Sequence, residues 1–371
     1  MVVTVSQENL NKGLSLVNKA VSQKSTLPVL SNILVEARKE GLYLSSTNLE
    51  TSITAYIPAK VSEVGNTTVP AKIFSDFINA LPPLPIEVTL KDETLEVQAE
   101  QFRASLATIS ASEFPEIPKP ETGEILTIDS SEFARNLNKV VFSASADEGR
   151  PVLNGVLFSQ KPEELTLVAT DGYRLSKNTI KFKNAGNVTQ EFVLPARTLL
   201  EVARIAENEE GDISLFLDES KNQTIFKTTN VVISCRLIDG SYPEYERIIP
   251  KESAIKTQLP VEELLRSLRI AAIFAKDIGN VVKLKLDPAT KTVEINAQTA
   301  QLGSGSSKLS SKIEGKEPLS IAFNSRFLLE GLAQCGSEIT FSALNPTSPI
   351  MIQPKAEPDF IYIVMPVRVQ G

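Results

Sequence analysis

The sequence predicts an α+β protein built from three tandem duplicated domains, each made of two strand–helix–strand units. Three observations support this architecture. The chain has 371 residues, more than a single hydrophobic core usually serves. Two proline-rich stretches divide it into thirds of about 120 residues, which is a common domain size. A pattern of an apolar strand end followed by a short helix, with a basic residue near the helix start, recurs through all three thirds.

The two proline-rich stretches mark the expected domain boundaries. Residues 114–123 contain three prolines and a glycine, and residues 242–253 form a second stretch of this kind. Proline cannot continue a central strand or helix, so both stretches interrupt regular structure. We therefore expect domains at residues 1–122, 123–252 and 253–371.

Each third repeats the same order of elements. An amphipathic helix comes first, and these helices are expected to begin near Gln7, Ser131 and Glu262. Half-buried antiparallel strands follow, with alternating or clustered apolar residues, at residues 29–36, 152–158 and 281–286. A second helix then begins at Pro70, Pro195 and Asn324.

Two local signals define the starts of the second helices, and one segment departs from the pattern. Proline is favoured at the first helical position because its missing N–H would be unpaired there anyway. Asn324 and Ser325 can cap the last helix. Residues 301–307 are rich in glycine and serine, so we expect a loop there rather than a strand.

Basic residues occupy a repeated position in these helices. When Leu10, Phe133 and Leu264 are taken as inward-facing anchors, the base follows two residues later, about 200° around the helix axis. The bases near the helix starts are Lys12, Lys72, Arg135, Arg197, Arg266 and Arg326. Further bases on the same helices or just after them are Lys19, Lys24, Lys139, Arg204, Arg269 and Lys276.

This basic pattern favours contact with phosphate. A cation near a helix N-terminus opposes the macrodipole by a few tenths of a kcal/mol, which suggests a role other than helix stability. No aromatic or amide set suited to reading bases accompanies these residues, so sequence-independent contact with nucleic-acid phosphates is favoured. The alternative is that the bases only keep exposed helix faces soluble. The whole chain has a net charge of −7, and its acidic remainder would keep nucleic acid off other surfaces.

Composition excludes several classes of enzyme. The chain has no histidine, which removes Ser-His and Cys-His nucleophile pairs and most zinc sites. Carboxylate or lysine chemistry stays open, but we expect no enzyme activity, no cofactor and no metal. Cys235 and Cys335 are isolated thiols, as in a reducing compartment. With no signal peptide and no apolar run of about 18 residues, a cytoplasmic protein is expected.

Three segments resemble the bacterial DNA polymerase III beta sliding clamp family. They are residues 169–176 (ATDGYRLS), 240–250 (GSYPEYERIIP) and 362–369 (YIVMPVRV), with shorter matches at 26–32 and 153–155. The resemblance covers the whole chain in order. It implies a head-to-tail homodimer of three-domain subunits that closes into a ring, with the helices lining the hole and antiparallel sheets outside.

The resemblance also implies a function and partners. Such a ring encircles double-stranded DNA without sequence preference and tethers the replicative polymerase, so it confers processivity without bond chemistry of its own. Lys24 and Lys72, with Arg197 and the other helix bases, would contact the DNA backbone. The clamp loader, the polymerase and other DNA-processing proteins would bind through short clamp-binding peptides.

Two further sets of residues carry over by position. The expected peptide pocket comprises Leu153, Thr170, Gly172, Tyr173, Arg174, Leu175, Pro243, Arg247, Ile248, Thr347, Pro349, Ile363, Val364, Met365, Pro366, Val367 and Arg368. In this pocket Arg174 and Arg247 would fix the peptide. The expected dimer interface comprises Ala104, Leu106, Ile273 and Phe274. The chain departs from the family pattern at Tyr173, where many relatives have His, at Ala104, where a larger apolar residue is common, and at Val369, which replaces a usual Leu.

Two other functions were weighed against a DNA clamp. A carboxylate-dependent enzyme should break the repeat symmetry with one cluster of acids, and the sequence shows none. A scaffold that uses the same pocket without DNA should tolerate charge reversal of Lys72, Arg197 and Arg326, whereas a clamp should not.

Overall fold

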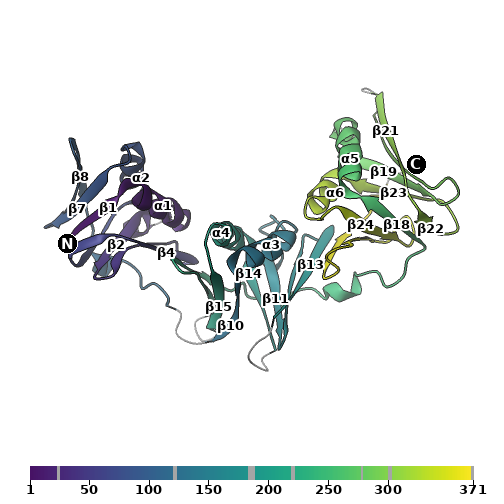
Figure 1. Cartoon of the computed structure of the whole chain (residues 1–371). Helices are drawn as coiled ribbons and strands as arrows, with labels where there is room; N and C mark the ends of the chain where they lie inside the picture. The colour runs from purple at the N-terminus through teal and green to yellow at the C-terminus, as the bar shows by residue number, and fades with distance from the viewer. Residues whose placement is uncertain are drawn as a thin grey trace. The chain divides into compact units, whose positions relative to one another are not determined.

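The computed structural model describes residues 1–22, 26–119, 123–182, 189–218, 222–276, 279–299 and 303–368. They form two compact units, and each unit combines two separate stretches of the chain. The first unit comprises Met1–Ala134 and Thr198–Leu237, and the second comprises Arg135–Arg197 and Ile238–Gly371. Figure 1 labels most of the elements along the chain.

The first unit contains two antiparallel sheets among its described residues. The five-stranded sheet has the order β5-β1-β7-β8-β9, with strands at Lys60–Glu63, Val2–Ser6, Pro85–Lys91, Thr94–Ala99 and Phe102–Ala107. The eight-stranded sheet has the order β10-β15-β16-β17-β4-β3-β2-β6, with strands at Glu124–Asp129, Asp212–Asp218, Gln223–Lys227, Val231–Arg236, Thr51–Ile57, Gly41–Thr47, Asn32–Arg38 and Gly65–Pro70.

The second unit is also built on two antiparallel sheets in its described part. The nine-stranded sheet has the order β14-β11-β12-β13-β26-β25-β24-β18-β22, with strands at Gln190–Pro195, Gly155–Lys161, Glu164–Thr170, Arg174–Lys181, Phe360–Val364, Ile350–Pro354, Glu338–Ala343, Ile255–Pro260 and Ile313–Glu314. The four-stranded sheet has the order β21-β20-β19-β23, with strands at Gly303–Ser310, Thr292–Thr299, Val281–Asp287 and Leu319–Asn324.

The two largest sheets join strands from different sequence repeats. In the first unit β17 pairs with β4, with Val231 opposite Ala55, and the buried hydroxyls of Ser52 and Ser234 hydrogen bond across the pair. In the second unit β13 pairs with β26. Strands that would be open edges in an isolated repeat are therefore covered by a neighbouring repeat.

Six α-helices occur in the described residues, and their positions confirm the predicted helix starts. They are α1 (Gln7–Val17), α2 (Ala71–Ala80), α3 (Ser130–Val141), α4 (Ala196–Glu207), α5 (Val261–Ala275) and α6 (Ser325–Leu332). Each helix puts apolar residues on its buried face. On α1, for example, Leu10, Leu14 and Val17 are fully buried.

The structure corrects two details of the helix starts. Pro70 and Pro260 lie at the N-cap, and Pro195 ends β14, so proline precedes these helices instead of occupying their first position. Its fixed φ orients the entering chain without removing a helical donor. Asn324 caps α6 as predicted, because its side chain accepts from the Arg326 N–H at 3.0 Å. Ser325 is the first helical residue and does not serve as the cap.

The prediction of a loop at residues 301–307 is wrong for Gly303 onward, and residues 301–302 lie outside the described residues. β21 pairs with β20 along its whole length, from Gly303 opposite Thr299 to Ser310 opposite Thr292. Glycine at 305 lets Phe274 of α5 pack on the strand, since a Cβ there would lie 2.5 Å from Phe274 Cδ2. Backbone pairing and helix packing thus outweigh the low strand propensity of glycine and serine.

Several absences apply to the described part of the chain only. No helix there is long and apolar enough to cross a membrane. No group of three or more Cys, Asp, Glu or His side chains could hold a metal ion. Both cysteines are free thiols, and burial raises the pKa of each to about 12, so neither is an activated nucleophile.

A substitution at Gly331 of α6 tests how closely this helix packs against Tyr362 of β26. A Cβ at this position would lie 2.0 Å from Cε1 of Tyr362, whose ring is fully buried and whose hydroxyl donates to the Phe327 carbonyl. We expect Gly331→Ala to lower the free energy of unfolding by about 1–3 kcal/mol because the ring cannot move aside. Urea unfolding followed by circular dichroism measures this loss.

The matched control is Gly336→Ala, because a Cβ at that position would meet no atom within 4 Å. Its unfolding midpoint should stay close to that of the parent chain. Equal midpoints for the two variants would contradict the packing described for Tyr362.

Candidate partner site and basic helix faces

A tight turn at Asp171–Gly172 begins the candidate partner site. Asp171 Oδ1 accepts hydrogen bonds from the N–H groups of Tyr173, at 2.8 Å, and Arg174, at 3.0 Å. Thr170 Oγ1 donates to the Arg174 carbonyl at 2.6 Å and accepts from the Gly172 N–H at 3.1 Å. Gly172 has a φ of +92°, which explains why glycine stands there. These bonds hold the turn that positions Tyr173.

Arg174 is committed to partners within the chain. Its Nε donates to Asp171 Oδ2 at 3.0 Å, its Nη2 donates to the Phe142 carbonyl at 2.9 Å, and its Nη1 donates to Glu330. The guanidinium also lies over the rings of Phe142 and Phe327, at 5.3 and 4.8 Å from their centroids. This geometry does not favour the predicted role of Arg174 in fixing a peptide. Its half-buried guanidinium links the turn to Phe142 and Glu330.

The electrostatics of Arg174 agree with that role. Burial lowers the pKa of its guanidinium, but the hydrogen bond and charge of Glu330 and the charge of Asp171 raise the pKa by more. The side chain is only 10% exposed, so its charge is balanced by carboxylates and not by water. Arg247 differs sharply, because its side chain is 81% exposed and pairs with Glu244, three residues earlier in the same loop.

Tyr173 is the most exposed aromatic side chain of the site. It is 63% exposed, and its ring stacks on Phe327 at a centroid distance of 6.4 Å. Its carbonyl accepts from the Met365 N–H at 2.8 Å, which joins the turn to the C-terminal segment. Met365 and Pro366 are half-buried there. The site therefore offers an aromatic ring beside a flexible thioether, groups that suit an apolar peptide side chain.

A layer of apolar side chains supports the site from below. Its buried members are Leu157, Val168, Leu175, Val193 and Ile363, and the half-buried residues packed on them are Val152, Ile238, Tyr242, Tyr245, Ile249 and Ile361. Burial raises the pKa of the Tyr242 hydroxyl, which stays neutral. The loop that carries Pro243, Arg247 and Ile248 is thus anchored through its tyrosines.

The structure divides the predicted pocket residues into two groups. Leu153, Thr170, Leu175, Ile363 and Val364 are buried and act as support. The exposed or half-buried members are Gly172, Tyr173, Arg174, Pro243, Arg247, Ile248, Thr347, Pro349, Met365, Pro366, Val367 and Arg368. Strand pairing brings several of them together, since Val364 lies opposite Arg174 on one side and Ile350 on the other.

Sequence reasoning missed the contribution of α6 and the end of α3. Phe327 and Glu330 of α6 contact Tyr173 and Arg174, and Phe142 at the end of α3 supplies a ring and a carbonyl. The i,i+3 spacing of Phe327 and Glu330 places them on one helix face. It does not say which segment that face meets.

The helix bases are exposed where the helical phase predicts them. Lys12, Lys19, Lys72, Arg135, Arg197, Arg204, Arg266, Arg269 and Arg326 are all exposed, while the apolar anchors are buried. Three of them form ion pairs along their own helices: Arg204 with Glu201 at 3.1 Å, Arg266 with Glu262 at 2.9 Å and Arg326 with Glu330 at 3.9 Å. Exposed pairs of this kind contribute little energy, so an incoming phosphate could replace them.

Two predicted bases do not join this set. Lys139 is 7% exposed, and its Nζ lies 2.9 Å from Glu357 Oε1, so its prediction as a DNA-facing residue is wrong. It lies on a flank of α3 that the segment around Glu357 covers. Lys24 lies outside the described residues.

The predicted interface residues lie at or next to open sheet edges. Ala104 and Leu106 belong to β9, the edge of the five-stranded sheet, where Leu106 is 7% exposed. Phe274 packs on β21, the edge of the four-stranded sheet, and Ile273 is 64% exposed beside it on α5. An exposed isoleucine next to an open strand edge is typical of a surface that another chain covers.

Comparisons with known proteins agree along the whole chain. Family models of the DNA polymerase III beta subunit match in order: the N-terminal domain at residues 1–118, the central domain at 127–244 and the C-terminal domain at 246–368. The beta sliding clamp of Synechococcus elongatus is 33% identical over 381 residues, covering 100% of both chains. That of Bacillus subtilis is 27% identical over 380 residues, covering 99% of this chain and 100% of the relative.

Solved structures show the same similarity in three dimensions. The DNA polymerase sliding clamp of Bacillus subtilis has a TM-score of 0.94 at 26% identity. The DnaN sliding clamp of Pseudomonas aeruginosa, solved bound to griselimycin, has a TM-score of 0.93 at 26% identity. Each comparison covers 100% of both chains.

Truncation of the two arginines of the site should lower the free energy of unfolding by very different amounts. Arg174→Ala removes the cation that pairs with Asp171 and Glu330 and that lies over two rings, and it leaves Glu330 with only the 3.9 Å pair to Arg326, so we expect a loss of about 2–4 kcal/mol in unfolding free energy. Arg247→Ala removes an exposed pair and should change stability by less than about 0.5 kcal/mol. Urea unfolding of both variants measures the difference, and a similar small loss for the two would show that Arg174 is not a structural connector.

Proposed function

The chain belongs to the DNA polymerase III beta subunit family, the bacterial sliding clamps, and from this premise we propose that two copies close head to tail into a ring around duplex DNA. The protein is a non-catalytic processivity subunit of a DNA polymerase. In the proposed ring the three domains of each chain, with boundaries near residues 122 and 252, supply half of the circle. Its place of action is the cytoplasm, where bacterial DNA is replicated.

The observation that carries the DNA contact is the exposed base opposite a buried apolar anchor on every α-helix described. Such bases, among them Lys72, Arg197 and Arg266, give positive charge without groups that read bases. Attraction to phosphate is then independent of sequence and can be exchanged between neighbouring phosphates, as sliding requires. The net charge of −7 requires that acids dominate elsewhere on the surface.

Open strand edges support the proposed dimer. β9 and β21 each end a sheet and carry unpaired backbone groups on one side. A head-to-tail contact would pair β9 of one copy with β21 of the next, which continues the sheet across the junction. Ile273 and Phe274 would then meet the side of β9 that carries Leu106.

The site around Tyr173 is proposed to take the short clamp-binding peptides of the clamp loader and the polymerase. Tyr173, Met365 and Pro366 offer apolar contacts, and Arg247 offers an exposed charge. Arg174 holds the turn in place from below. Thr347 and Pro349 lie in the loop before β25, whose first residue Ile350 pairs with Val364.

Retention on DNA tests the proposed function. The protein, loaded by its clamp loader onto nicked circular DNA, should stay with the circle during gel filtration at high salt, because topological linkage does not depend on screened phosphate contacts. Cutting the circle should release it. Equal release from circular and linear DNA would refute the topological mechanism.

A substitution at Ile273 tests the proposed dimer in an experiment without DNA. Ile273→Asp places a charge on the surface beside β21, so we expect the sedimentation coefficient to fall from that of a dimer toward that of a monomer. The control is Leu200→Asp, which replaces a leucine that is 47% exposed on α4, a helix that carries none of the predicted interface residues. A dimer that survives Ile273→Asp unchanged would place the interface elsewhere.

A further inference from the structure

One edge of the eight-stranded sheet is only partly covered. β6 is the last strand of this sheet, and Thr68 pairs with Ile109 through both backbone groups, at 3.1 and 3.2 Å. These groups therefore point away from β2. The β2–β6 register runs without a shift, with Glu36 opposite Asn66, so the N–H and C=O of Asn66 point the same way as those of Thr68.

The segment around Ile109, which pairs with β6 at Thr68, turns away before it reaches Asn66. After Ile109 the chain forms a short 3-10 helix at Ala111–Glu113, and among the described residues no backbone partner is found for Asn66 on this side. Val64, just before β6, is 58% exposed on the same stretch. An unpaired edge of this kind can accept another extended chain by backbone hydrogen bonds.

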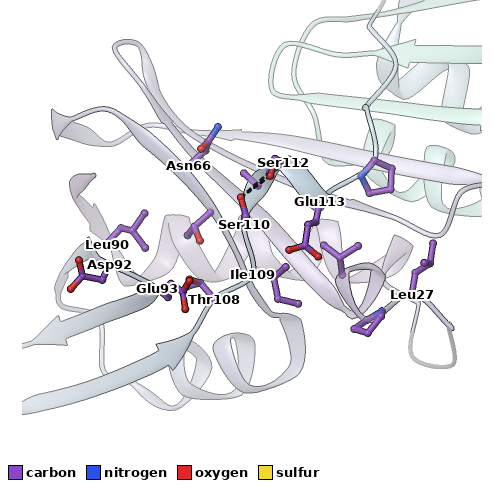
Figure 2. Close-up of a pocket in the computed structure, with 15 residues that line it drawn as sticks. Leu27, Asn66, Leu90, Asp92, Glu93, Thr108, Ile109, Ser110, Ser112 and Glu113 are labelled. Carbon is purple, nitrogen blue, oxygen red and sulfur yellow. Dashed lines mark hydrogen bonds between the residues drawn. The ribbon is translucent and has the colours of Figure 1, made fainter.

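Two cavities meet at this open edge, and both are lined by Asn66, Ala111 and Pro115. The larger cavity has a volume of about 990 Å³ and the smaller about 330 Å³. Figure 2 shows the larger one, with Asn66 and the Ser110–Ser112 hydrogen bond at one side and Asp92 and Glu93 at another. A strand added beside β6 would send alternate side chains toward opposite sides of the sheet.

The two cavities differ in chemistry. The larger is lined by three carboxylates, Asp92, Glu93 and Glu113, among apolar residues such as Leu90 and Ile109, and no lysine or arginine occurs among the described residues that line it. It therefore favours a basic side chain with an aliphatic stem.

The smaller cavity favours an apolar side chain. It is lined by Tyr43, Phe114 and Ile117. Its lining also includes two cations, Arg38 and Lys119, and two carboxylates, Glu36 and Glu116. Arg38 pairs with Glu36 at 2.9 Å and lies over the Tyr43 ring at 4.2 Å.

We propose that the β6 edge at Asn66 is a second docking surface, which binds an extended segment of a partner protein in which basic and apolar residues alternate. The segment adds a strand to β6, its basic side chains enter the cavity of Asp92, Glu93 and Glu113, and its apolar side chains enter the cavity of Tyr43 and Phe114. This surface lies in the first unit and is separate from the Tyr173 site of the second unit. It does not depend on the function proposed for that site.

A designed peptide tests the proposal directly. The probe is fluorescein-labelled Arg-Val-Lys-Val-Arg-Val with a blocked C-terminus, measured by fluorescence anisotropy on the full-length protein. We expect saturable binding that weakens by about tenfold or more in the triple variant Asp92→Asn, Glu93→Gln, Glu113→Gln. The control triple variant is Asp76→Asn, Glu50→Gln, Glu87→Gln, which removes the same charge from exposed positions outside the cavities and should bind as the parent does.

A modified probe tests strand addition itself. The same peptide, N-methylated at alternate residues on its backbone, keeps its charge but loses the hydrogen bonds of one edge, so it should lose most of its affinity. Hydrogen exchange should also slow in the segment containing Asn66 when the unmodified probe binds.

Three results with the peptide probes would overturn the proposal, and a fourth concerns self-association. They are absence of saturable binding, equal weakening by both triple variants, or full affinity of the N-methylated probe, which would indicate electrostatic adhesion alone. Concentration-dependent self-association that requires Asp92 and Glu113 would overturn it in favour of a second copy of this chain as the occupant.

Discussion

Backbone pairing between strands from different sequence repeats organises this protein. The sequence divides into thirds, but the hydrogen-bonded ladders do not stop at those divisions, since β17 pairs with β4 and β13 pairs with β26. Each junction covers two edges that would otherwise present unpaired N–H and C=O groups to water or to other chains. The compact units therefore cut across the repeats. Among the strands that end these sheets are β9, β21 and β6, and these are the edges at which we propose that another chain adds.

The candidate partner site is held in place by one of these junctions, the pairing of β13 with β26. The β13–β26 pair brings the Asp171–Gly172 turn beside Met365, and Arg174 then connects the turn to α3 and α6. A buried cation with two carboxylates and two aromatic rings is costly to disturb, because each partner would be left desolvated. The exposed Tyr173 and the half-buried Met365 are therefore held in fixed positions from which they can contact a ligand. The two arginines differ in their surroundings, because Arg174 is held by partners from several segments, whereas Arg247 is 81% exposed and pairs with Glu244 of its own loop.

The helices are close to neutral, with nine lysines and arginines and eight aspartates and glutamates, so the excess acid of the chain lies outside them. Each helix nevertheless exposes a base on the side opposite its buried apolar anchors. This arrangement reconciles an acidic protein with a polyanionic partner, because local fields at contact distance matter more than net charge once salt screens distant charges. Lys139 shows the limit of the pattern, since the chain around Glu357 covers it.

The sequence by itself determined the α+β class, the six helix starts, the exposure of nearly all the helix bases and the family, because these depend on local periodicity and on contiguous motifs. It also predicted the segments of a partner site, which stays a prediction. Only the tertiary structure decided that β21 is a strand, that Lys139 is buried and that Arg174 is held by Phe142, Phe327 and Glu330. Each of these depends on a partner distant in sequence, as Phe274 is for Gly305 and Glu357 is for Lys139. Helical phase and motif spacing fix which way a side chain points, but the fold decides what it meets there.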